Sequence, residues 1–428
     1  MSSSYKLFSD PIHGFISVPR KLLLPLVKSP EVQRLRRLRQ LGVGNLVFPS
    51  AEHSRFGHAL GSLALMQDAL RTLKESGTPI SDDEFEASLA AALLHDIGHG
   101  PFSHTLEFQL FRAVPHECLT RRLIQRMNER FDGALNLTLE IFDDTYQRPF
   151  FGNLLASQLD VDRLDYLRRD SHFTGVIEGS IGVERVIRTM RVYPREGGAG
   201  SRIVIEAKGI YAAENVLVAR RHMYWQVYVH KTVLAGDHVL VAALCRARSH
   251  LKDGNNEAIR NISPTLAPFL EKSYDKSALN DSNVLDAFLE LDDTDVMASL
   301  KCWMHSTDPI LADLSRRFIE RDLFRCVFLP ESPDPDTIRA WKQRVADTLV
   351  QMGLSNREQS VADADYYIFV DRSSHSAYHR KEGPIHTLEA DGTVSEVLAR
   401  KDSRALDALT HYVEKPYVCF PKAADLGI

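Results

Sequence analysis

The sequence predicts a mainly α-helical protein with small β-hairpins and a C-terminal region of mixed α and β structure. Three observations lead to this fold class. Apolar residues recur at helical spacing through most of the chain as far as residue 353. Short alternating runs flank a Gly-rich loop at 194–201, which is typical of a hairpin. Beyond residue 353, strand-like runs and an Asp-Gly turn appear.

Length and composition place the chain among ordinary globular proteins. It has 428 residues, of which 44% are hydrophobic and 25% charged, so roughly two or three domains are expected. We expect a helical domain over residues 1–310 and a small α+β region over residues 311–428. The formal net charge of −5 creates no global field that would recruit nucleic acid, although local basic patches remain open.

Cysteine usage and hydropathy favour a cytoplasmic location. The five cysteines are scattered and include no C-x-x-C pair, as expected for reduced thiols. The N-terminal residues lack an apolar signal segment, and no run of 18 apolar residues follows. We therefore expect neither a signal peptide nor a membrane span.

The first elements should be a short strand at 15–18 and a helix over 31–41. Turn signals at Asp10-Pro11 and His13-Gly14 precede the strand. The helix follows Ser29 as N-cap and Pro30 at the first helical position, which suits proline. Four arginines accompany its apolar stripe and form either a solvated face or, because arginine forks suit phosphate, an anion-binding surface. They are Arg34, Arg36, Arg37 and Arg39.

Three further helices are expected to carry histidines at their ends. The first begins near His53–His58 and runs to about Leu73. The second opens on three acidic residues at 82–84, which suits the positive end of a helix, and leads into His95-Asp96. The third begins at Pro115-His116 and runs to about Met127.

The stretch from Leu93 to His104 is the centre of the predicted site. An apolar, Ala-rich helix runs into His95-Asp96, and two glycines and a proline then end it. Three histidines and a carboxylate within ten residues offer a mixed nitrogen and oxygen ligand set for a divalent metal. The alternative interpretation of a lone His-Asp pair is a capped helix end.

The segment 158–170 should form a helix that carries four aspartates. Asp is a poor interior helix former, so four in eleven residues are unusual. They form either a salt-bridged surface with three neighbouring arginines or a metal- and ligand-binding surface. The apolar stripe of the same helix consists of Val161, Leu164 and Leu167.

Short strands at 191–193 and 202–205 should form a hairpin, followed by one long helix over 209–232. On an uninterrupted helix, Arg220, Tyr224, Tyr228 and Lys231 would share one face. Aromatic stripes usually pack in a core. Because basic residues interleave this one, it is better suited to a nucleobase and phosphates.

The remainder of the chain completes the predicted fold. Residues 234–328 read as helical, and an amphipathic helix is expected at 336–353. A strand at 366–370 and a hairpin at 385–394, with an Asp-Gly turn, form the α+β region.

Several phrases together resemble the HD-domain phosphohydrolases, and in particular their deoxynucleoside triphosphate triphosphohydrolase branch. The order His58, His95-Asp96, Asp162 matches the H…HD…D pattern of that family. The resemblance extends to animal SAM-and-HD-domain enzymes and their bacterial relatives, clearly over residues 5–240 and loosely beyond. The matching phrases are those at 8–14, 33–36, 40–42, 55–58, 95–104, 160–166 and 228–231.

The resemblance implies an HD-domain helical bundle with one divalent metal ion per active site. The implied ligands are His58, His95, Asp96 and Asp162. Such a set suits Fe, Mn, Co or Zn better than Mg, which is less natural with imidazole. The implied reaction is attack of water on the α-phosphorus of a deoxynucleoside triphosphate, which releases the intact triphosphate.

Further roles follow from the resemblance residue by residue. His116 matches the general acid for the leaving 5′-oxygen, and His104 with Glu107 matches a histidine–carboxylate pair beside the attacked phosphorus. Tyr228 would pack under the sugar and exclude a 2′-hydroxyl. The implied phosphate-binding residues are Arg55, His99, Arg163, Arg220 and Lys231. The implied partners of the sugar 3′-hydroxyl are Gln40, Tyr166 and Asp170.

The resemblance also implies a homo-oligomer, a dimer or tetramer, with a nucleotide effector. Lys28 stands where the animal enzymes carry an aspartate that reads guanine, and Ser9 replaces an asparagine nearby, whereas Gln33 and Arg36 remain. A guanine-specific effector site is therefore not expected. Tyr224 occupies the position of a second active-site histidine.

Two other functions compete with the triphosphohydrolase hypothesis. The same metal site would serve a phosphohydrolase of nucleoside monophosphates or cyclic nucleotides. A single phosphate, however, would not need as many basic side chains as Arg55, Arg163, Arg220 and Lys231 provide. Alternatively, the chain is a nucleotide sensor or binds single-stranded nucleic acid through its arginine-rich 34–39 segment. The complete H…HD…D set weighs against an inactive protein.

Overall fold

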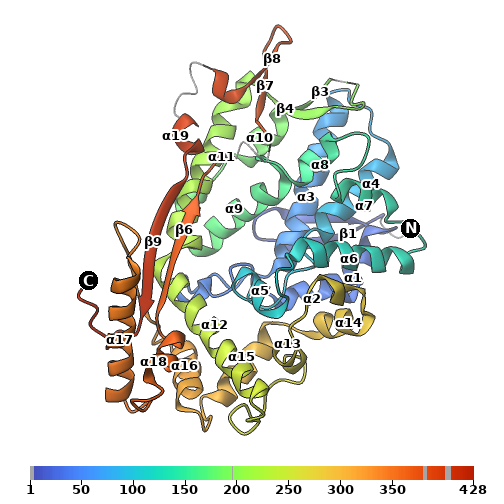
Figure 1. Ribbon diagram of the computed structural model, residues 1–428. Coiled ribbons are helices and arrows are strands. Elements are labelled where there is room, and N and C mark those ends of the chain that lie inside the picture. Colours follow the sequence, from blue (N-terminus) through green and yellow to red (C-terminus); the bar gives the residue numbers. More distant parts are fainter. Residues whose placement is uncertain (1–3, 195, 379–382, 401–405) are drawn as a thin grey trace.

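A computed structural model describes residues 4–194, 196–378, 383–400 and 406–428 of the chain (Figure 1). Helices make up most of it, which confirms the predicted fold class. The helices are α1 (Leu23–Lys28), α2 (Pro30–Arg34), α3 (Arg55–Glu75), α4 (Asp82–Leu94), α5 (Glu107–Leu110), α6 (His116–Arg130), α7 (Asn136–Phe142), α8 (Phe150–Leu155), α9 (Val161–Thr174), α10 (Val183–Thr189), α11 (Ile210–Met223), α12 (Lys231–Lys252), α13 (Ala267–Glu271), α14 (Ser282–Glu290), α15 (Asp293–Trp303), α16 (Pro309–Ile319), α17 (Pro335–Gln351), α18 (Ser360–Asp363) and α19 (Asp407–Thr410). The strands are β1 (Tyr5–Asp10), β2 (Gly14–Pro19), β3 (Met190–Tyr193), β4 (Arg202–Glu206), β5 (Arg325–Phe328), β6 (Phe369–His375), β7 (His386–Leu388), β8 (Val394–Glu396) and β9 (Val413–Phe420).

Helices α3, α4 and α9 pack together at the centre of the helical part (Figure 1). The predicted bounds of α3 and α4 are confirmed, and Ser81 and Glu84 form a capping box at the start of α4. The end of α4, from Ala87 to Leu94, is wholly buried, because a helix that is apolar on all sides has no face for water. This packing brings the end of α4 and the start of α3 into the protein interior.

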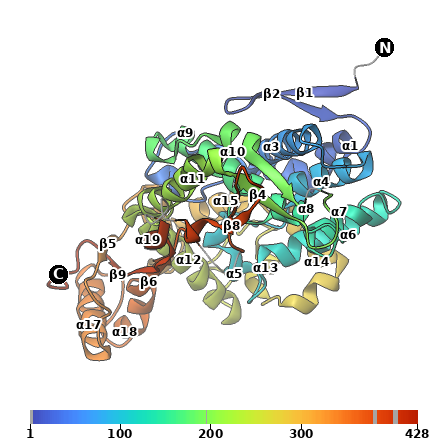
Figure 2. The ribbon, with the colours of Figure 1, turned by 90° about the horizontal axis from the view of Figure 1, so that it is seen from above.

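Three small sheets surround the helices. Strands β1 and β2 form an antiparallel hairpin whose turn joins Asp10 to Gly14. Strand β4 pairs in parallel with β7. The hairpin predicted from strands at 191–193 and 202–205 and the one predicted at 385–394 therefore form one sheet in the order β3-β4-β7-β8. The third sheet has the order β5-β9-β6. Figure 2 shows the β1–β2 hairpin at one end of the molecule and the β5-β9-β6 sheet at the other.

The prediction of one helix over 31–41 is wrong. Helix α2 ends at Arg34, and a 3₁₀ turn follows over Leu35–Arg37. The next backbone N–H groups bond to distant segments, because Arg39 N–H donates to Asp293 Oδ2 (3.0 Å) and Gln40 N–H to the His53 carbonyl (3.0 Å). These tertiary hydrogen bonds replace the helical ones.

The long helix predicted over 209–232 is interrupted. Helix α11 ends at Met223, a π-helix spans Tyr224–Tyr228, and α12 begins at Lys231 after a bend of 53°. π-turns of this kind re-aim side chains and are frequent at functional sites. The single face expected for the residues from Arg220 to Lys231 therefore does not exist.

The α+β region beyond residue 311 contains the predicted elements with shifted bounds. The 385–394 hairpin and the 336–353 helix are confirmed as β7–β8 and α17. The strand expected at 366–370 begins only at Phe369, and β5 lies inside the segment expected to be helical. Strands β5 and β6 both pair with β9, which lies far away in the sequence and could not be identified as their partner from local patterns. Arg195, in the predicted Gly-rich loop, lies outside the described residues.

Over the described ranges, no single helix is both long and apolar enough to cross a bilayer. One bent pair in the described part of the chain, Ala207–Tyr228 and Lys231–Lys252, meets those criteria jointly, by length and composition.

Candidate active site

Three of the predicted metal ligands meet where α3, α4 and α9 pack together. His58 lies near the start of α3, His95 caps the end of α4, and Asp162 lies in the first turn of α9. The Nε2 atoms of His58 and His95 are 3.2 Å apart. Asp162 Oδ1 lies 2.9 Å from the first and 3.4 Å from the second. We call His58, His95, Asp96 and Asp162 the metal-ligand cluster.

The hydrogen bonds of the two imidazoles fix which nitrogens face the cluster. His95 Nδ1 donates to the carbonyl of Ala92 (2.8 Å), which can only accept, and His58 Nδ1 donates to Asp165 Oδ2 (2.7 Å). When both rings are neutral, their Nε2 lone pairs therefore face one another beside a carboxylate. Two such lone pairs repel unless a cation lies between them, so the donor set fits a divalent metal ion.

Electrostatics in the cluster agree with a cation site. Burial lowers the pKa of His58, but its hydrogen bonds to the carboxylates of Asp162 and Asp165 outweigh burial and raise that pKa to about 10. Burial alone would raise the pKa of Asp162, yet the two histidines hold it below its usual range. A proton and a metal ion compete for the same lone pair on His58.

Asp96 faces the other members of the cluster while also forming an ion pair. Its Oδ1 lies 3.6 Å from His95 Nε2, and its Oδ2 lies 3.8 Å from His58 Nε2. Arg55 donates to Asp96 Oδ2 and, through Nε, to Ser103 Oγ (2.9 Å). Arg55, predicted to bind phosphate, is therefore buried here and holds the carboxylate of a predicted ligand.

A second cluster joins the predicted catalytic residues on Glu107. Its two carboxylate oxygens accept from His104 Nδ1 (2.9 Å) and His116 Nδ1 (2.8 Å). Burial alone would raise the pKa of Glu107, but these hydrogen bonds hold it well below its usual range. The His99 ring stacks on His116 with centroids 3.7 Å apart. Burial and the nearby Arg55 guanidinium lower the pKa of His99 well below its usual range, so this ring is neutral.

The residues predicted to bind the sugar gather around Asp170. His53 Nε2 (2.7 Å) and the Tyr228 hydroxyl (3.0 Å) both donate to its carboxylate. The backbone N–H of Gln40 donates to the His53 carbonyl, while the buried Oε1 of Gln40 has no hydrogen-bond partner within the part of the chain that the structure describes. Tyr166 lies between the two groups, with its ring 6.5 Å from that of His58 and 6.1 Å from that of Tyr228.

The predicted phosphate-binding residues from Arg220 to Lys231 are more dispersed. We call the segment Arg220–Lys231 the substrate arm. Arg220 Nη1 lies 3.4 Å from both Gln158 Oε1 and the carbonyl of Ala377. Arg163, on α9, pairs with Asp160 (3.2 Å). Lys231 is exposed at the start of α12, beyond the bend, and does not share a helical face with Arg220.

Sequence reasoning missed the residues that support the metal-ligand cluster. Asp165 is hydrogen-bonded to His58 and His53 to Asp170, and His13 is hydrogen-bonded to Asp165 in turn, but none of the three was assigned a role of its own. One signal was available for Asp165, because it lies three residues after Asp162 and thus on the same helical face. His13 and His53 lie over 100 residues from their partners, and no local pattern points to them.

Comparisons with known proteins identify the domain that carries this geometry. Residues 55–170 match the HD domain, and residues 181–263 match the HD associated region. The uncharacterized protein YwfO of Bacillus subtilis is 34% identical over 92% of this chain and 87% of its own length. A crystal structure of a phosphohydrolase from Bacteroides thetaiotaomicron has a TM-score of 0.90 and 38% identity, covering 97% of this chain and 99% of that one.

A more distant relative has a named activity. The deoxynucleoside triphosphate triphosphohydrolase SAMHD1 of Xenopus laevis is 28% identical over 61% of this chain. The chain spans about half of that relative, 48% of its length.

Proposed function

The chain belongs to the HD-domain family of phosphohydrolases, and from that premise we propose that it hydrolyses deoxynucleoside triphosphates to deoxynucleoside and triphosphate. The observation that carries the proposal is the pair of Nε2 atoms of His58 and His95, 3.2 Å apart beside Asp162, with basic side chains nearby. The similarity to SAMHD1 supports the choice of substrate.

His58, His95 and Asp162, with Asp96 alongside, would hold one divalent ion. When bound, that ion supplies Lewis acidity and lowers the pKa of water. Imidazole and carboxylate donors favour Fe, Mn, Co or Zn over Mg. Arg55 keeps the carboxylate of Asp96 in place on the protein side of the cluster.

The chain's own residues provide the proton needed by the leaving group. Water attacks the α-phosphorus, the bond from phosphorus to the 5′-oxygen breaks, and His116 donates a proton to that oxygen. Glu107 accepts from His116 Nδ1, orients the ring and stabilises its protonated form. His104 shares the same carboxylate and lies, 70% exposed, on the solvent side.

The remaining side chains would bind the two ends of the substrate. Arg163, Arg220 and Lys231, with the neutral His99, would hold phosphate oxygens. Either the Asp170 carboxylate or Gln40 Oε1 would accept from the sugar 3′-hydroxyl beside Tyr166, and the lack of a partner for Gln40 Oε1 among the described residues supports this assignment. Because its hydroxyl bonds to Asp170, the Tyr228 ring is held under the sugar, where a 2′-hydroxyl would collide with it.

Three further parts of the proposal concern the protein as a whole. We propose a cytoplasmic homo-oligomer, a dimer or tetramer, that responds to a nucleotide effector. Lys28 replaces the guanine-reading aspartate of the animal enzymes, so the effector is not restricted to guanine nucleotides. The α+β region beyond residue 311 forms its own structural part.

The proposal is tested by incubating the purified protein with each dNTP and rNTP, singly and in mixtures, with Mn²⁺ or Mg²⁺. We expect deoxynucleoside and intact triphosphate on chromatography, with no turnover of rNTPs. Release of pyrophosphate or single phosphate would contradict the cleavage point. Turnover of nucleoside monophosphates alone would favour the competing reaction. An Asp162→Asn preparation serves as the control for contaminating phosphatases.

A further inference from the structure

Asp165 joins the metal-ligand cluster to the N-terminal hairpin. Its Oδ2 accepts from His58 Nδ1 (2.7 Å), and its Oδ1 accepts from His13 Nε2 (2.6 Å). The Asp165 carboxylate is wholly buried. Each oxygen therefore serves a different histidine, one in the cluster on α3 and the other in the turn between β1 and β2.

Arg169 and Asp10 fix both ends of this connection. Arg169 Nε donates to Asp165 Oδ2 (2.8 Å), and its Nη1 donates to Asp10 Oδ2 (2.9 Å). Asp10 Oδ1 accepts the backbone N–H groups of Ile12 (2.9 Å) and His13 (3.0 Å). The turn that carries His13 is thus tied to the same guanidinium that orients Asp165.

Helix α3 leaves room for this network. A Cβ on Gly61 would lie 1.9 Å from Asp165 Oδ1 and 2.5 Å from Arg169 Nη2. A Cβ on Gly57 would lie 3.3 Å from Arg169 Nη1. The two glycines flank His58 in sequence, so the helix that carries the ligand is shaped around the residues that support it.

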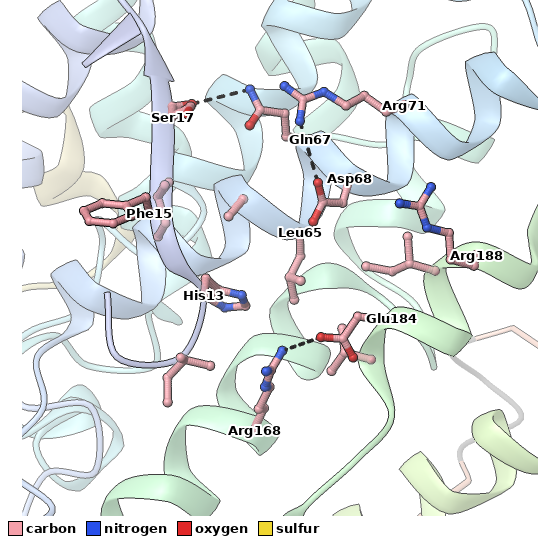
Figure 3. Close-up of a pocket in the computed structure, with 15 residues that line it drawn as sticks. His13, Phe15, Ser17, Leu65, Gln67, Asp68, Arg71, Arg168, Glu184 and Arg188 are labelled. Atoms are coloured by element: carbon pink, nitrogen blue, oxygen red, sulfur yellow. Dashed lines mark hydrogen bonds and ion pairs between the residues drawn. The ribbon is translucent and has the colours of Figure 1, made fainter. Parts of the chain in front are cut away.

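The other side of His13 lines a cavity of about 290 Å³ (Figure 3). In Figure 3 the His13 ring lies between the β1–β2 hairpin and the charged side chains of α3, α9 and α10. Among them, Arg168 forms an ion pair with Glu184 (3.0 Å). The hairpin is therefore bounded by open space on one side and by the metal-ligand cluster, through Asp165, on the other.

We propose that Asp165 and His13 are positioning residues through which the N-terminal hairpin sets the metal affinity of the site. Asp165 holds His58 as the Nδ1–H tautomer, so that Nε2 presents its lone pair to the cluster. His13, anchored by the hairpin turn, holds Asp165 in the orientation that this requires. The proposal rests on the proposed metal site but not on the identity of the substrate.

The test measures metal binding, without substrate, in Asp165→Asn, His13→Ala and His13→Gln proteins. Co²⁺ and Mn²⁺ affinities are obtained by calorimetry and by the Co²⁺ absorption spectrum, with folding checked by circular dichroism. We expect about 10- to 100-fold weaker binding for Asp165→Asn. The loss should be smaller for His13→Ala and partly restored in His13→Gln, whose amide can still donate to Asp165.

Arg168→Ala is the matched control. Arg168 lines the same cavity as His13 but forms an ion pair with Glu184, so the metal affinity of the Arg168→Ala protein should equal that of the wild type. Wild-type affinity in folded Asp165→Asn and His13→Ala proteins would overturn the inference. If Asp165→Asn does not fold, the metal affinities of His13→Ala and His13→Gln alone test the inference. Failure of the wild-type protein to bind one ion per chain would instead contradict the metal site itself.

Discussion

The metal-ligand cluster and the substrate arm are stabilised in different ways. The cluster lies where three core helices pack, and its histidines bond to α4 itself and to Asp165 of α9. The substrate arm depends on a strand about 150 residues further along the chain. There the Tyr224 hydroxyl donates to the carbonyl of Ser374 (3.1 Å), and the Tyr224 ring stacks on that of His375 with centroids 3.8 Å apart.

This difference suggests a division of labour between the two regions. The predicted metal ligands His58, His95 and Asp162 are carried by three helices of the core, whereas the His104 side chain is 70% exposed. The substrate arm contacts β6 through Tyr224, so the C-terminal region can alter substrate binding while leaving the metal site intact. Variants in the two regions should therefore affect different measured quantities.

The largest effect is expected from His95→Ala. Loss of an Nε2 donor should abolish stoichiometric metal binding and lower kcat by about 1,000-fold or more. The Tm should fall only slightly, because the side chain has a single hydrogen bond to the protein outside the cluster, to Ala92. Turnover, metal content and Tm are measured together, with His172→Ala, an exposed histidine on α9, as the control. Unchanged turnover in the folded variant would reject the metal site.

Arg220→Ala should separate the arm from the cluster. We expect kcat/KM for a deoxynucleoside triphosphate to fall about 10- to 100-fold, the value of a hydrogen bond to a charged group. Metal affinity should stay the same. Arg221→Ala, which removes the same charge from the neighbouring position, is the control. If Arg220→Ala left both quantities unchanged, the arm would not bind phosphate and a monophosphate substrate would be favoured.

The two regions also differ in how well the sequence predicts them, because the cluster depends largely on local signals and the substrate arm on contacts with a distant strand. The ends of α3 and α4 were predictable, because caps and helix-ending glycines are local signals that agree with the tertiary structure. The convergence of His58, His95 and Asp162 followed from the family resemblance, and the structure brings these residues together. Their individual roles remain proposals.

The parts that sequence reasoning missed depend on contacts between distant segments. The π-helix begins at Tyr224, the residue that hydrogen-bonds to and stacks on β6, and α2 ends shortly before the residues whose N–H groups bond to Asp293 and His53. His58 is supported by Asp165, which in turn is hydrogen-bonded to His13, a residue 152 positions earlier in the sequence than Asp165. Helical periodicity is a property of one segment of sequence. It cannot predict that hydrogen bonds from a distant segment will end the helix.

A smaller effect is expected from Tyr224→Phe, which tests the link between the arm and β6. The variant removes the hydrogen bond to Ser374 but keeps the aromatic ring, a change of about 1 kcal/mol. We expect KM to rise about five-fold, with little change in kcat or metal content. His375→Ala, which removes the stacking partner instead, should shift KM in the same direction. A change in kcat alone would contradict the proposed division of labour.

The smallest effect concerns the carboxylate of Asp237. Asp237, on α12, accepts a hydrogen bond from the Thr105 hydroxyl (2.6 Å), next to His104. Burial raises its pKa to about 7, and the bond from Thr105 only partly offsets this. The folded state therefore holds the proton more tightly than the unfolded state, whose pKa is about 3.9. Asp237 consequently destabilises the protein increasingly as the pH rises from about 4 to 7.

Asp237→Asn should remove this pH-dependent cost, because the amide stays neutral and its oxygen can still accept from Thr105. We expect the variant's Tm to exceed that of the wild type by a margin that is larger at pH 8 than at pH 5. Thermal unfolding at both pH values measures this margin. Asp253→Asn, a change at the exposed C-cap of α12, should give the same margin at both values. A pH-independent margin for Asp237→Asn would mean that the carboxylate is already ionised at pH 5.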